Sequence, residues 1–131
     1  MTRATSDDRG AAPVDFVLVG SLLTLVFLAV MQVAIDYHVR NVLAACVADG
    51  ARYAANADVA DPTAGAAQAN EEIRRALGSS YAHAFAPRQT DVAGAPVVTI
   101  EAHARLPLLA WFLPAGPSVT VEGHALVEPR R

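Results

Sequence analysis

The chain has 131 residues and a formal net charge of −3, and all ten of its basic side chains are arginine. It is long enough for one modest domain, and no basic patch is present that would neutralise phosphates, so no nucleic acid partner is expected. The single cysteine, Cys46, excludes an intramolecular disulfide and a cysteine metal cluster.

A long apolar run lies near the N-terminus, directly after a short polar and charged segment at residues 1–10. No charged residue falls between Asp15 and Asp36. A helix of about 20 residues spans about 30 Å, which matches the hydrocarbon core of a bilayer. A soluble helix of this length would show a polar face, so we predict that residues 16–35 cross a membrane. The interruptions in the run are Gly20, Ser21, Thr24 and Gln32.

The helical pattern continues beyond Asp36, because apolar residues recur three or four positions apart from Tyr37 to Asn56. We predict one helix from about Pro13 to about Asn56, in lipid over its first half and amphipathic outside lipid over its second half. A short second helix is predicted over 63–77, with Thr63 as its cap and Gly78 at its end.

The hydrophobic period then changes to two. Apolar and polar residues alternate over 98–106 and 119–127, which predicts two half-buried antiparallel strands, and 81–88 is a candidate third strand. Gly94 and Pro96 predict a turn before the first clear strand. The predicted fold is therefore α+β, with a small antiparallel sheet packed on the outer half of the long helix. The expected contacts join two sets of side chains, Val39, Val42, Leu43 and Val47 on the helix and Val98, Ile100, Val119 and Val121 on the strands.

A short motif stands immediately before the apolar run. Residues 9–16 read Arg-Gly-Ala-Ala-Pro-Val-Asp-Phe, so that an acid and an aromatic residue follow the glycine by five and six positions. This motif resembles the prepilin cleavage site of the Tad/Flp pilus system. The alanine-rich residues 44–54, which contain Gly-Ala-Arg, are similar to the segment that follows the anchor in the TadE-like family. The resemblance to that family extends from about residue 9 to about residue 56.

The resemblance implies that a membrane prepilin peptidase cleaves the chain between Gly10 and Ala11. Glycine suits such a site because its missing side chain lets the protease approach the backbone. The domains would be a leader at 1–10, a transmembrane anchor at 11–35 and an extracytoplasmic, pilin-like α+β domain at 36–131. The protein would cross the bacterial inner membrane once, with its N-terminus in the cytoplasm.

The resemblance also implies a structural component of a Tad/Flp-type pilus or related secretion apparatus. The implied partners are the membrane, the prepilin peptidase, other pilin-like subunits and Tad assembly proteins. The alternative is an unprocessed single-pass membrane protein whose outer module binds a ligand or partner. The sequence shows no catalytic constellation, so neither an enzyme nor a cofactor is expected.

Asp15 and Phe16 are the candidate assembly acid and its adjacent aromatic residue. In pilins the acid is thought to face the free amine of a neighbouring subunit, which cleavage would create here at Ala11. A lone carboxylate in a bilayer costs about 2.5–3.5 kcal/mol on insertion scales, so it needs such a partner. Alternatively, Asp15 lies in the first helical turn and is stabilised there by the helix dipole.

Three further groups are open to two interpretations. Gly20, Thr24 and Gln32 are candidate helix–helix contacts, or ordinary residues of a membrane helix. Trp111 and Phe112, in the apolar segment 106–114, form either a lipid or partner surface or a loop that covers the core. Cys46 reads either as a packed side chain or as the cysteine of a late lipobox.

The histidines show no metal spacing and no metal is expected, although His103 and His124 could face each other on adjacent strands.

Overall fold

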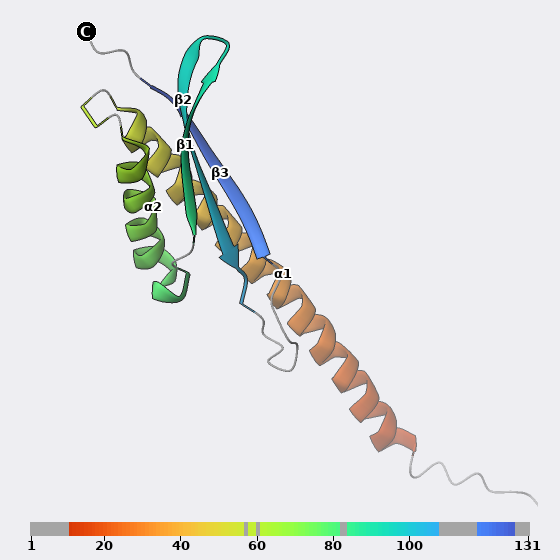
Figure 1. The fold of residues 1–131 in the computed structure, drawn as a ribbon. Helices are drawn as coiled ribbons and strands as arrows, with labels where there is room; N and C mark the ends of the chain where they lie inside the picture. The colour runs from red at the N-terminus through yellow and green to blue at the C-terminus, as the bar shows by residue number, and fades with distance from the viewer. Residues whose placement is uncertain (1–10, 57, 60, 82–83, 108–117, 128–131) are drawn as a thin grey trace, which may run out of the picture. The chain divides into compact units, whose positions relative to one another are not determined.

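The structure is a computed structural model that describes residues 11–56, 58–59, 61–81, 84–107 and 118–127 (Figure 1). Its elements follow in the order α1 (Ala11–Ala55), α2 (Pro62–Leu77), the short 3₁₀ helix η2 (Ser79–Tyr81), β1 (Phe85–Val92), β2 (Ala95–Arg105) and β3 (Ser118–Leu126). The predicted α+β class is therefore confirmed. The chain divides into two compact units at Ala34/Ile35, each of which is described by itself.

Helix α1 is a single element of 45 residues. Its only proline, Pro13, lies in the first turn, where a missing amide proton breaks no intrahelical hydrogen bond. Behind Pro13 the helix contains only two glycines, Gly20 and Gly50, so nothing in its interior forces a break. The prediction of one continuous helix to the region of Asn56 is confirmed.

Helix α2 begins one residue earlier than the sequence pattern predicted. Its cap is Asp61, whose carboxylate accepts a 2.9 Å hydrogen bond from the Thr63 amide, and Pro62 is its first residue. The prediction that Thr63 is the cap is wrong, because Thr63 is already the second residue of the helix. Its hydroxyl donates a further hydrogen bond to the capping carboxylate of Asp61. Gly78 ends the helix as predicted, at a φ of 95°, and its amide bonds the Arg74 carbonyl.

The sheet has three antiparallel strands in the order β1-β2-β3. Strands β1 and β2 form a hairpin with a two-residue turn, Ala93 and Gly94, in which both φ angles are positive. The candidate third strand exists, but it covers 85–92 and not 81–88. The shift arises because the second half of β1 is exposed on both faces and shows no alternation in sequence.

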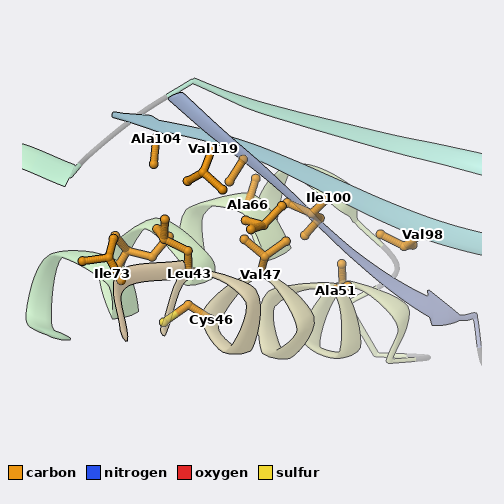
Figure 2. Close-up of a cluster of buried hydrophobic side chains, with 14 of the residues drawn as sticks. Leu43, Cys46, Val47, Ala51, Ala66, Ile73, Val98, Ile100, Ala104 and Val119 are labelled. Carbon is orange, nitrogen blue, oxygen red and sulfur yellow. The ribbon is translucent and has the colours of Figure 1, made fainter. Parts of the chain in front are cut away.

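The second unit, Ile35–Arg131, is called the outer unit below. Its core joins the second half of α1 and helix α2 to one face of the sheet (Figure 2). From α1, Val39, Leu43 and Val47 are buried, with at most 3% of each side chain exposed. The predicted helix–sheet packing is confirmed, with Val42 only partly buried at its margin. The buried strand residues are Val98, Ile100, Ala102, Ala104, Val119 and Val121.

Strand β3 crosses α1 at very short range. A methyl group added to Gly123 would lie 2.6 Å from the carbonyl oxygen of Val47, inside any ordinary contact distance. Only glycine lets the strand backbone rest directly on the helix at this point. The sheet is therefore held on the outer half of α1 by backbone proximity as well as by side-chain burial.

Candidate membrane-anchoring and assembly site

The first half of α1 has the properties of a membrane span. Among the described residues it is the one helix long and apolar enough to cross a bilayer, with a mean hydropathy of 2.4 over an 18-residue window, none of which is buried. Large apolar side chains are exposed all around it, from Phe16 at 79% to Met31 at 40%. A helix that is apolar on every side needs an apolar surrounding.

The two hydroxyl groups in this segment are satisfied within the helix. Ser21 donates to the Val17 carbonyl at 2.6 Å, and Thr24 donates to the Gly20 carbonyl at 2.9 Å. Such back-bonding leaves no free polar hydrogen, which makes both residues compatible with lipid. They therefore do not need a neighbouring helix for their hydrogen bonds.

The candidate helix–helix contacts show where a partner could approach. A methyl group added to Gly20 would meet nothing within 4 Å, so this side of the helix is open. Thr24 is exposed one turn further along, and Gln32 is half-buried and has an interaction within the chain. Gly20 and Thr24 thus form an open strip of small side chains, consistent with close helix approach.

Asp15 and Phe16 are both exposed, and they lie close to the start of α1. The helix begins at Ala11 and has no acidic residue in its first turn, because Asp15 is its fifth residue. The attraction between a carboxylate and the helix dipole falls off beyond the first turn. Asp15 therefore lies at the limit of the reach of the helix dipole, and both interpretations of its role remain predictions. Gly10, the other half of the predicted cleavage site, lies outside the described residues.

The alanine-rich half of α1 supplies one wall of the outer unit's core. Gly50, Ala51 and Ala54 are buried, and Cys46 is only 8% exposed. Burial, followed by the negative charges of Glu72 and Asp49, raises the pKa of the Cys46 thiol above its ordinary value of 9.0. A buried, neutral thiol favours the packing interpretation of Cys46 over lipidation.

The predicted lipid or partner surface at Trp111 and Phe112 lies outside the described residues. Of the apolar segment that contains them, Leu106 is half-buried and packs against the core. Leu106 directly follows β2, and Ser118 begins β3. Both described ends of this connection therefore lie at the same end of the sheet, where Arg105 of β2 pairs with Ser118 of β3.

The exposed face of the sheet carries the pattern Thr-x-Glu-x-His twice, once in β2 and once in β3. His103 lies opposite Thr120 and His124 lies opposite Thr99, and each imidazole Nδ1 is 2.9 Å from the threonine Oγ1. The idea that His103 and His124 face each other is therefore wrong. Within the described part of the chain, no three His, Cys, Asp or Glu side chains are placed to share a metal ion.

The fold and the site together define an α+β protein whose N-terminal helix has the length and apolar surface of a single membrane span. A family model described as TadE-like protein matches residues 10–52. The predicted resemblance to the TadE-like family is thus confirmed over the anchor and most of the outer half of α1. No curated protein and no solved structure matches the chain.

Proposed function

We propose that this chain is a pseudopilin-like structural component of a Tad/Flp-type pilus or related secretion apparatus, without enzymatic activity. The observation that carries the proposal is the division of α1. Its first half exposes apolar side chains on all sides, whereas its second half buries one face under a sheet. The TadE-like match spans the junction between these halves, so the resemblance covers the part of the chain that joins anchor to body.

Processing is the first step of the proposed function. A prepilin peptidase would cleave between Gly10 and Ala11 and create a cationic amine at the start of α1. Asp15 lies four residues further along the helix, about 6 Å along its axis. In the assembled state, the Asp15 carboxylate of one subunit would pair with the Ala11 amine of a neighbour, which offsets the cost of a charge near lipid.

The proposed partners follow from the surfaces of the anchor. Other pilin-like subunits would pack on the strip formed by Gly20 and Thr24, where added bulk meets no atom of this chain. The assembly proteins of the Tad system would hold the subunit in the inner membrane, with residues 36–131 outside the cytoplasm. Trp111 and Phe112 would contribute a second apolar surface for lipid or for a partner.

The proposal is tested by deleting the gene in its native bacterium and observing surface pili or the secreted product of the apparatus. Complementation with the intact chain should restore assembly, whereas Gly10→Leu and Asp15→Ala should not. Asp15→Glu is the matched control, because it keeps the charge and should restore assembly. Normal pili in the deletion strain would contradict the proposal.

An observation that favours the alternative function is an open cleft between the end of α1 and the end of β3. Its lining includes Arg52, Asn56 and His124, together with the apolar side chain of Leu126. Small-molecule sites combine apolar walls with a few placed polar groups, and this cleft offers both kinds of contact. Under the alternative, the intact chain would keep its N-terminus uncleaved and would capture a ligand in this cleft. Arg52→Gln would then abolish that capture.

A further inference from the structure

Three exposed arginines of the outer unit have no ion-pair partner among the described residues. They are Arg40 in α1, Arg74 in the last turn of α2, and Arg105 at the end of β2. A further arginine in the same turn of α2, Arg75, is 67% exposed and does have an ion-pair partner, Glu71, at 3.3 Å. Although these residues are far apart in the sequence, the fold brings them to one end of the unit.

The directions of the elements explain this arrangement. Helix α2 starts with Gly65 against Gly50 of α1, runs antiparallel to α1, and reaches Leu43 with its Ile73 (Figure 2). Strand β2 runs the same way, with Val98 toward Ala51 and Ala104 toward Leu43 (Figure 2). Arg40 lies less than one helical turn before Leu43 in α1. The last residues of α2 and β2 therefore lie at the same end of the unit as Arg40.

The opposite end of the unit is acidic. Its aspartates come from the last turns of α1, the connection to α2 and the β1–β2 hairpin, namely Asp49, Asp58, Asp61 and Asp91. The two arginines there are already paired, Arg52 with Asp49 at 2.5 Å and Arg88 with Glu101 at 2.6 Å. The basic end also holds three carboxylates: Glu71 pairs with Arg75, Glu72 accepts a hydrogen bond from the neutral Gln68, and Asp36 has an interaction within the chain. Its four arginines outnumber these three acids.

The basic end is also the end at which the chain enters the outer unit. Ile35, the last residue of the apolar run, is the first residue of the outer unit, and Tyr37, two residues on, is 68% exposed. Tyrosine is enriched at the level of lipid headgroups because its ring is apolar and its hydroxyl is polar. If the apolar run lies in a bilayer, as the proposed function requires, then Arg40, Arg74 and Arg105 are tethered beside its surface.

We propose that this basic end, formed by Tyr37, Arg40, Arg74, Arg75 and Arg105, docks on anionic phospholipid headgroups. Basic side chains within a Debye length of an anionic membrane are attracted to it, and salt weakens the attraction. The acidic opposite end is repelled by the same surface. The two ends together set the orientation of the outer unit, with α2 and β2 pointing their carboxyl ends toward the lipid.

The test uses the full chain in vesicles of phosphatidylcholine, with or without phosphatidylglycerol, that contain a headgroup-attached quencher. One sample carries a fluorophore on Ser79→Cys, beside the end of α2, and a second carries it on Thr90→Cys, in β1 near the opposite end; both positions are exposed. Phosphatidylglycerol should at least double the quenching at Ser79→Cys and leave Thr90→Cys unchanged. High salt should reverse the increase.

The matched variants separate this docking from general charge effects. The triple change Arg40→Gln, Arg74→Gln and Arg105→Gln should abolish the increase, whereas Arg52→Gln with Arg88→Gln should keep it. Thermal unfolding of each variant verifies that the outer unit is folded. Equal quenching at both positions, or quenching that ignores phosphatidylglycerol, would overturn the docking proposal while leaving the anchor intact. A chain that fails to float with any vesicle would overturn the anchoring itself, and with it the proposed function.

Discussion

Gly50 of α1 and Gly65 of α2 face each other so closely that a methyl group on Gly50 would lie 2.5 Å from the Gly65 carbonyl oxygen. The same methyl would lie 2.8 Å from the Cβ of Ala69, while a methyl on Gly65 would meet Ala54 and Ile100. The two helices therefore approach through small residues, which lets Ile73 and Leu43 close the core on one side of the crossing.

Gly65→Ala tests this helix crossing. In an open helix the change should stabilise by up to about 1 kcal/mol, because alanine has the higher helix propensity. Here we expect destabilisation of about 1–3 kcal/mol, because the added methyl must push two packed backbones apart. Thermal unfolding of the outer unit in detergent measures the effect. Gly20→Ala is the matched control and should not lower the melting temperature, since nothing lies within 4 Å of its new methyl group.

Leu43→Ala tests the packing of the sheet on α1. Leu43 is 1% exposed, so its truncation should lower the free energy of unfolding by about 2–5 kcal/mol. Protease resistance of the outer unit should be lost, because so small a domain has little stability to spare. Leu23→Val, at a site that is 65% exposed in the apolar run, should preserve resistance. Unchanged resistance in Leu43→Ala would mean that the helix does not cover the sheet in solution.

Cys46 gives the outer unit a defined response to alkaline pH. Because burial raises the pKa of its thiol, the unfolded chain releases the proton at a lower pH than the folded chain. Stability from this group is therefore complete below the unfolded pKa and is lost as pH rises toward the folded pKa. Urea unfolding at neutral and alkaline pH should show a smaller alkaline loss for Cys46→Ala than for the intact chain. An identical loss in both would show that the thiol is not buried.

Orientation in the membrane is tested with an impermeant thiol reagent on intact cells. Ser118 is exposed at the start of β3, so Ser118→Cys should be labelled if residues 36–131 lie outside the cytoplasm. Thr2→Cys in the uncleaved Gly10→Leu chain should be labelled only after the membrane is broken. The reverse pattern would contradict the predicted orientation, while the buried Cys46 contributes little background.

The sequence predicted those parts of the fold that leave a local periodic pattern. The second half of the long helix, the second helix and the alternating strands β2 and β3 each bury one face, and burial at regular spacing is readable along the chain. Strand β1 was misplaced because Arg88–Val92 are exposed on both faces, so no alternation marks them. Its position depends on pairing with β2, which is a tertiary contact.

The close approaches were not predictable for the same reason. Gly50, Gly65 and Gly123 read as ordinary glycines until the fold brings Gly65 onto Gly50 and Gly123 onto Val47. The histidine arrangement depends on strand register, and register places His103 opposite Thr120. The candidate site, by contrast, could be proposed from sequence, because the motif at residues 9–16 and the apolar run are contiguous in the chain.

N-terminal sequencing of the protein purified from native membranes tests the central claim most directly. If the chain is a pseudopilin-like component, the prepilin peptidase removes residues 1–10, and the mature protein begins Ala11-Ala12-Pro13. The Gly10→Leu chain, purified in parallel, should keep its leader. A native protein that begins at Met1 or Thr2, from cells in which the peptidase is active, would contradict the account.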